Sequence, residues 1–286
     1  MPEAGGWDVP LPVTADDEDP DWLPPGINAG VAHPARVYDY FLGGKDNFAA
    51  DRALGDALTA QIPSAPYSAR ANRAFLGRAV RYLVNERGIR QFLDIGTGIP
   101  SAGNTHEVAQ ALAPDTRALY VDNDPIVLAH ARALMSSHPA GATAFIQADA
   151  REPGKILADP ALRETLDLAE PVALMLLSIL PFFRDTEDPQ GIVSTLLDAL
   201  PSGSYLTISH ITADFIKPEQ AANAVAAGRH SGVTYVPRTQ AEIAAFFSGL
   251  DLVEPGVVPI LTWHPDDGEP ADPHAASHYA GMARKP

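Results

Sequence analysis

Three aspartates recur along the chain at intervals of about one strand and one helix. Asp94, Asp122 and Asp149 each follow a short apolar run, and they are 28 and 27 residues apart. In an open parallel sheet, ligands bind outside the carboxyl ends of the strands, so we expect the three side chains to line one crevice. Such a row of carboxylates suits a ligand that carries positive charge and hydroxyl or amino donors.

A glycine-containing turn follows the first of these aspartates. Gly96 and Gly98 allow the backbone to approach a ligand closely before a helix begins near Asn104. Strand-to-helix turns also use glycine for steric reasons alone. The carboxylates therefore contribute more to the prediction of a binding site than the glycines do.

S-adenosylmethionine has the chemistry that the carboxylates require. It carries ammonium and sulfonium cations, and its ribose and adenine groups are hydrogen-bond donors. We expect Asp94 to face the methionine end, Asp122 the ribose and Asp149 the adenine amino group. An aspartate can instead cap a turn, which we favour for Asp124 because Pro125 follows it. The predicted cofactor-binding residues are Asp94, Gly96, Gly98, Asp122, Asn123, Asp149 and Ala150.

A nicotinamide dinucleotide is the competing ligand, because an acidic residue after the second strand also binds ribose in that type of fold. Two features count against it. Ser101 stands where a third glycine or alanine is expected, and Asp94 would lie close to a pyrophosphate that it repels. An NAD-dependent oxidoreductase is therefore the less favoured alternative.

Short apolar runs alternate with helical patterns in the part of the chain that carries these aspartates. Runs typical of buried strands occupy residues 91–95, 118–121, 144–147, 172–179 and 205–209. Alternation of strand and helix predicts an α/β fold, with a mostly parallel sheet and helices on both faces. Residues 252–259 and 277–283 are two further strand-like pieces, which would suit a closing antiparallel hairpin.

Three segments of different composition are expected along the chain. Residues 1–30 contain seven acidic side chains, no basic one and six prolines, which predicts a disordered acidic tail. Residues 31–88 form a predicted helical extension, in which the clearest helix covers residues 67–87. Residues 89–286 form the predicted cofactor-binding domain.

The segment 36–48 has an unusual composition for a plain helix. Gly43 and Gly44 lie in its middle, and each glycine costs a helix about 1 kcal/mol relative to alanine, so we expect a helix broken by a turn. The segment either folds over the crevice as a lid or packs on the sheet edge as a brace. The lid hypothesis places four side chains toward cofactor or substrate, and these are Arg36, Tyr38, Tyr40 and Lys45.

Candidate catalytic residues are few. His210 follows the fifth predicted strand on the expected edge, and Tyr38 is the second candidate, while Ser178 is a candidate substrate contact after the fourth strand. We expect His106 to be solvated, and Arg73 to belong to the solvated face of its helix. The chain contains no cysteine, and we predict no metal site.

Charge and hydropathy exclude several classes of partner. Acidic residues outnumber basic ones by 36 to 20, a net charge of −16, so the surface repels nucleic acid and anionic lipid. The longest apolar run, residues 172–180, is far shorter than the roughly 20 residues of a membrane span. No signal-peptide pattern is present at the N-terminus. These features predict a cytoplasmic protein.

Several stretches resemble known methyltransferases. Residues 93–98 and 121–125 are similar to the first two motifs of the class I S-adenosylmethionine-dependent enzymes. Residues 35–52, 70–75, 92–108 and 277–281 resemble a bacterial family first described as a domain of unknown function and later named S-adenosyl methyltransferase. This resemblance covers roughly residues 33–286 and implies a seven-stranded sheet, with its last strand antiparallel, and bound S-adenosylmethionine. It implies no particular substrate.

The sequence departs from the usual pattern after the fourth predicted strand. Pro181 stands where such proteins often carry a histidine or another polar residue. This favours catalysis by positioning over proton transfer from that strand. We therefore predict a methyltransferase acting on a small molecule, with a non-catalytic regulatory protein that binds the same cofactor as the alternative. The methyl acceptor and the oligomeric state do not follow from the sequence.

Overall fold

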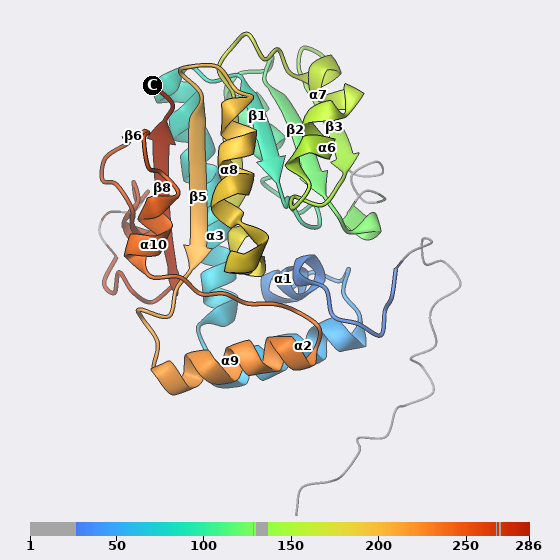
Figure 1. Cartoon of the computed structure of the whole chain (residues 1–286), viewed down its shortest axis with the longest axis vertical. Coiled ribbons are helices and arrows are strands. Elements are labelled where there is room, and N and C mark those ends of the chain that lie inside the picture. The colour runs from blue at the N-terminus through green and yellow to red at the C-terminus, as the bar shows by residue number, and fades with distance from the viewer. Residues whose placement is uncertain (1–26, 128, 130–136, 267, 269) are drawn as a thin grey trace, which may run out of the picture.

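A computed structural model describes residues 27–127, 129, 137–266, 268 and 270–286. The predicted disordered tail at residues 1–30 lies outside the described residues except for residues 27–30. The described residues form a sheet flanked by helices, with a group of helices across one edge (Figure 1).

The sheet has eight strands. Its order is β3-β2-β1-β4-β5-β8-β6, with β7 also paired to β8. Strands β1 to β5 are parallel to one another, and β8 is antiparallel to β5, β6 and β7. The bounds of the strands are β1 Gln91–Ile95, β2 Arg117–Asp122, β3 Ala142–Gln147, β4 Ala173–Leu177, β5 Tyr205–Ile211, β6 Asp251–Leu252, β7 Val258–Pro259 and β8 His278–Arg284.

Helices precede, connect and follow these strands. The α-helices are α1 Pro34–Leu42, α2 Ala49–Gln61, α3 Ala65–Arg87, α4 Thr105–Leu112, α6 Pro153–Ala158, α7 Pro160–Thr165, α8 Pro189–Asp198, α9 Pro218–His230 and α10 Gln240–Ala245. Three 3₁₀ turns are η1 Leu180–Phe182, η2 Asp185–Glu187 and η3 Ile260–Thr262. Within the described residues, no helix is long and apolar enough to cross a membrane.

The predicted fold class is confirmed, and two details differ from the expectation. Residues 252–259 form two short strands, β6 and β7, instead of one, so the sheet has eight strands and not seven. The fourth strand ends at Leu177, because Ser178 adopts a left-handed conformation with φ of 55° and a 3₁₀ turn follows. The chain therefore leaves the sheet at the carboxyl end of β4.

Side chains of the central strands alternate between two apolar layers. Leu93, Leu119 and Leu174 pack with α6, α7, α8 and α10 on one face. Phe92 and Tyr120 pack with α3 and α4 on the other. Figure 1 shows α8 and α10 in front of the sheet and α3 behind it. Both faces are covered, so ligands can reach the sheet only at its edges.

Helices α1, α2 and α9 lie across the carboxyl ends of the strands, and we call these three helices the cap (Figure 1). Helix α1 ends at Gly43, whose φ of 82° is left-handed, so the predicted break is confirmed. The backbone of Gly44 lies so close to the Asp39 side chain that a Cβ at position 44 would be 1.9 Å from Asp39 Oδ1. Helix α9 follows β5 in the chain and packs on α2. Gln220 Nε2 of α9 donates to the Gln61 carbonyl of α2 at 2.9 Å.

Candidate functional site

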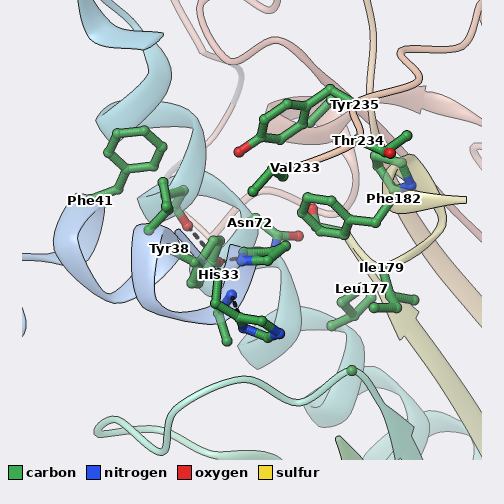
Figure 2. Close-up of a pocket in the computed structure, with 18 of the residues that line it drawn as sticks. His33, Tyr38, Phe41, Asn72, Leu177, Ile179, Phe182, Val233, Thr234 and Tyr235 are labelled. Atoms are coloured by element: carbon green, nitrogen blue, oxygen red, sulfur yellow. Dashed lines mark hydrogen bonds between the residues drawn. The ribbon is translucent and has the colours of Figure 1, made fainter. Parts of the chain in front are cut away.

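A cavity of about 520 Å³ lies between the strand ends and the cap. Figure 2 shows Tyr38 and Phe41 of α1 along one side, with Leu177 and Ile179 after β4 toward the strand ends. The sequence-predicted residues that line this cavity are Tyr38, Asp94, Gly96, Asp122, Asn123, Asp149, Ala150 and Ser178. The carboxyl ends of three strands and the first helix thus meet in one space.

Asp94, the last residue but one of β1, is buried on the side of α4. Thr105 Oγ1 donates a hydrogen bond of 2.6 Å to its Oδ2. Burial removes the carboxylate from water and raises its pKa to about 6. A carboxyl group in this state is stabilised in its ionised form by any cation placed beside it. Asp94 therefore fits the ammonium end of a cationic ligand.

Asp122 ends β2 and fixes the glycine-containing turn. Its Oδ2 accepts a hydrogen bond of 2.8 Å from the Gly98 backbone N–H, and its Oδ1 accepts one of 3.0 Å from that of Asp124. Burial again raises the pKa of this carboxyl group. Gly98 is thus part of the site's frame, although it does not line the cavity. Each oxygen retains a lone pair for a hydroxyl donor.

Asp149, after β3, lies at a more open part of the cavity. Its side chain is 30% exposed and forms an ion pair of 2.9 Å with Arg151. Asn123 Nδ2 donates to the same carboxylate at 3.4 Å. Asp149 is therefore available to an amino donor at the cavity mouth, where water partly screens its charge.

Three residues expected on the cavity side of the segment 36–48 lie elsewhere. Arg36 is buried, with Nη2 donating to the Val31 carbonyl at 2.8 Å. Tyr40 donates to Asp56 Oδ1 at 2.7 Å, and Lys45 is exposed. Residues three or four apart share a helix face, so the face that turns Tyr38 and Phe41 to the cavity turns Arg36 and Tyr40 away.

His210 also lies outside the cavity, contrary to the prediction. Successive residues of a strand point to opposite faces, and His210 points to the face that carries Phe246. Its Nε2 lies 3.0 Å from Arg238 Nη1, and its Nδ1 lies 2.7 Å from the carbonyl oxygen of Ile211. Burial lowers the pKa of His210 to about 3, so it is neutral at physiological pH.

His278, the first residue of β8, occupies the position that the sequence analysis assigned to His210. Its Nε2 lies 3.0 Å from Ser178 Oγ, and both residues line the cavity. Its Nδ1 is buried without a hydrogen-bond partner. Burial lowers the pKa of His278 to about 4, which leaves a neutral imidazole able to accept a proton. The only sequence signal for this residue was the resemblance across residues 277–281.

A chain of hydrogen bonds connects the cap to the sheet beside this pair. Ser209 Oγ donates to Asn72 Oδ1 at 2.5 Å, and Asn72 Nδ2 donates to Tyr38 Oη at 3.0 Å. Tyr38 Oη in turn donates to the Ala69 carbonyl at 2.9 Å. Burial raises the pKa of Tyr38, so its hydroxyl is neutral. This network fixes the Tyr38 hydroxyl at the cavity wall.

Two residues expected to be solvated have structural contacts instead. Arg73 lines the cavity and donates to the Ser101 carbonyl at 2.9 Å, which holds the loop before α4. His106 is buried, with Nδ1 at 2.7 Å from the Tyr120 hydroxyl. A helical repeat alone cannot distinguish a solvated face from one that a loop covers.

The spacing of His274 and His278 is one that a helix can use to bind a metal. Here the two residues lie in a loop and in β8, and the ring of His274 packs against Phe215 at 4.4 Å. Among the described residues, no group of three potential metal ligands occurs.

The sequence profile of the S-adenosyl methyltransferase family matches residues 20–286. The chain belongs to this family. Its cofactor is therefore S-adenosylmethionine. The carboxylates at the ends of β1, β2 and β3 can accept hydrogen bonds from the ammonium, hydroxyl and amino groups of this cofactor.

Two solved structures are similar to the chain over most of its length. A DUF574 family protein from Streptomyces avermitilis is 48% identical, with a TM-score of 0.86 over 90% of this chain and 98% of that one. A putative methyltransferase from Thermobifida fusca is 43% identical, with a TM-score of 0.83 over 93% and 99% of the two chains. Comparison with curated proteins gave no match.

Proposed function

We propose that the protein transfers a methyl group from S-adenosylmethionine to a small molecule, and that catalysis depends mainly on positioning. The observation that supports this is the shared cavity, with strand ends at one side and the cap at the other. A cofactor at the strand ends and a second ligand under the cap would be enclosed together. The net charge of −16 disfavours nucleic acid as the acceptor.

Each carboxylate has a proposed role toward the cofactor, which supplies an electrophilic methyl group on a sulfonium cation. Asp94 would bind the methionine ammonium, because a neighbouring cation offsets the cost of burying its charge. Asp122 would accept hydrogen bonds from the ribose hydroxyls, and Asp149 from the adenine amino group. Gly96, with φ of 71°, keeps the turn free of a side chain beside the ligand.

Positioning can supply most of the acceleration, because methyl transfer to an uncharged nucleophile neutralises the sulfonium. The side chains available to hold the acceptor are Tyr38, fixed by Asn72, and Ser178, paired with His278. Helix α1 crosses the carboxyl ends of the strands. This position supports the hypothesis that the segment 36–48 is a lid over the site, and disfavours the hypothesis that it is a brace on the edge of the sheet.

Calorimetric titration with S-adenosylmethionine, S-adenosylhomocysteine and NAD tests the cofactor site. We expect both sulfur nucleosides to bind and NAD to bind poorly. Asp122→Asn should weaken their binding about tenfold to a hundredfold, because a charged hydrogen bond contributes roughly 1.5–3 kcal/mol. Asp115→Asn is the matched control, since Asp115 is exposed and distant from the cavity. Tight binding of NAD without binding of either nucleoside would overturn the proposal.

Catalysis is tested separately from binding. Incubation of the protein and S-adenosylmethionine with a bacterial metabolite extract should produce S-adenosylhomocysteine, measured by mass spectrometry. A protein that binds the cofactor tightly but produces none with any extract would be a non-catalytic binding protein, and the proposed transfer would be wrong.

A further inference from the structure

The acidic and basic side chains of the cavity are confined to one part of it. They are His33, Arg73, Asp94, Asp122, Asp149, Arg151 and His278. Six of them belong to the strands, to the loops after them or to α3, and His33, just before α1, lies 3.1 Å from Asp124 after β2. The described lining from α2, α9 and residues 232–237 contains no acidic or basic side chain. We call this part of the cavity the apolar end.

Aromatic rings and aliphatic side chains form the apolar end. Phe41, Phe182 and Tyr235 surround it with Leu58 and Val233, and the rings of Phe182 and Tyr235 are 5.5 Å apart. Figure 2 shows Phe41 on one side and Val233, Phe182 and Tyr235 on the other, with the Tyr235 hydroxyl directed toward the Phe41 side. An aromatic or similarly flat apolar body would fit between such walls.

Two hydroxyls belong to this end, and that of Thr234 already accepts a hydrogen bond of 3.2 Å from Arg184 Nη2. The Tyr235 hydroxyl is the second. No hydrogen bond joins it to another described residue, and burial raises its pKa, so it remains a neutral donor. A ligand with one polar substituent could satisfy it. A charged ligand would instead lose its hydration here, because Arg151, whose Nη2 donates to the Phe182 carbonyl at 3.3 Å, is already paired with Asp149 and Glu187. Burial of a charge without compensation is strongly unfavourable.

The apolar end meets the strand ends at Ser178. The residue after it, Ile179, lies against the glycine-containing turn, because a Cβ at Gly96 would be 2.6 Å from Ile179 Cδ1. Ser178 is therefore beside the part of the cavity assigned to the methionine end of the cofactor. Ser178 and His278 are paired and both line the cavity, so a ligand that extends from the apolar end toward the transferred methyl group could contact them.

We propose that the methyl acceptor is an uncharged molecule with an aromatic or similarly flat apolar body, bound in the apolar end, with one hydroxyl or uncharged amino group at Ser178. This inference rests on the proposed function. As the new bond from that group to the methyl carbon forms, the sulfur–methyl bond breaks and its electron pair stays on sulfur. The proton of the acceptor passes through the Ser178 hydroxyl to His278 Nε2.

Binding of two matched probes tests the acceptor class. Protein saturated with S-adenosylhomocysteine is titrated with 2-naphthol and with 2-naphthoate, which share a ring system but differ in charge. We expect 2-naphthol to bind at least tenfold more tightly. Phe41→Ala should weaken 2-naphthol binding about tenfold and leave S-adenosylhomocysteine binding unchanged. Leu112→Ala, which removes an exposed side chain far from the cavity, should change neither.

Equal or tighter binding of 2-naphthoate would overturn the inference, as would 2-naphthol binding that Phe41→Ala does not weaken, or no 2-naphthol binding at all. Binding of S-adenosylhomocysteine reports on folding of each variant, and Phe41→Leu replaces Phe41→Ala if the latter does not fold. The titrations are repeated without the nucleoside. If the parent protein binds 2-naphthol but not S-adenosylhomocysteine, the proposed function is wrong. The probe results then still decide which class of ligand the apolar end binds.

Discussion

The two ends of the cavity are built in different ways. At the strand ends, each carboxylate has a partner close to it in the chain, which is Thr105 for Asp94, Asp124 for Asp122 and Arg151 for Asp149. At the apolar end, the walls come from distant segments, including α1, α2 and α9. The difference shows that the charged end depends on local geometry, and the apolar end on how the cap assembles on the sheet.

Arg36 joins the two ends, and its loss should have the largest effect. Its Nε lies 3.5 Å from Asp51 in the cap and 3.6 Å from Asp124 after β2, and its side chain is only 5% exposed. Arg36→Met would leave two buried carboxylates without this cation. We expect the free energy of unfolding to fall by about 3–5 kcal/mol, measured by urea denaturation.

The control for this variant is Arg70→Met, because Arg70 is exposed on α3. It should change the free energy of unfolding by no more than about 0.5 kcal/mol. A loss below about 1 kcal/mol in Arg36→Met would show that the cap is held without this ion pair, and that the two ends are energetically separate.

Asp94→Asn should stabilise the folded protein without ligand and at the same time weaken cofactor binding. The pKa of Asp94 is about 6 in the folded protein and 3.8 when unperturbed, so ionisation favours the unfolded state and stability falls as pH rises from about 4 to 6. At pH 7 the variant should be about 1–3 kcal/mol more stable without ligand. It should also bind S-adenosylmethionine at least tenfold more weakly.

Urea denaturation at pH 7 and pH 4 measures the stability part of this prediction. The gain should shrink to about 0.5 kcal/mol at pH 4, where Asp94 is protonated in the folded state and a little under half protonated in the unfolded state. His210 and His278, whose pKa values are lowered, destabilise both proteins equally as pH falls below about 6.5, so their effect cancels in the difference. A variant less stable than the parent protein at pH 7 would contradict the assigned cost of burying this carboxylate.

Tyr38→Phe should have the smallest effect. It removes the hydroxyl that accepts from Asn72 and donates to Ala69 but keeps the ring in the cavity wall. We expect a loss of about 1 kcal/mol in the free energy of unfolding and less than a threefold change in S-adenosylhomocysteine affinity. Tyr67→Phe, at an exposed tyrosine, is the control. A tenfold loss of affinity in Tyr38→Phe would place this hydroxyl on the cofactor.

Local spacing predicted the fold and the charged end well. The repeat of strand and helix brought Asp94, Asp122 and Asp149 to one cavity, because each interval is one complete unit of the sheet. Glycine and capping signals also marked real features, such as Gly43 after α1 and Asp124, whose Oδ1 accepts from the Ile126 N–H at 3.0 Å. These features depend on neighbours within a few residues or on a regular repeat.

The apolar end depends on register and on long-range packing, which single-sequence patterns do not contain. His210 was predicted to contact the substrate because it follows the fifth predicted strand at the expected edge of the sheet, but a shift of one residue in a strand reverses the direction of a side chain. His278 meets Ser178 across 100 positions through an antiparallel strand. Likewise, nothing local indicated which face of α1 would carry Phe41 toward the cavity.

The position of β8 in the sheet has a consequence for biosynthesis. This strand pairs with β5, β6 and β7, and Ser277, just before it, donates from its backbone N–H to Ser68 Oγ across 209 positions. Until β8 has left the ribosome, one edge of the apolar strand β5 has no partner. Unpaired strand edges template association with other chains. The nascent protein is therefore exposed to aggregation until β8 emerges and pairs with β5, and that is when protection by chaperones would matter most.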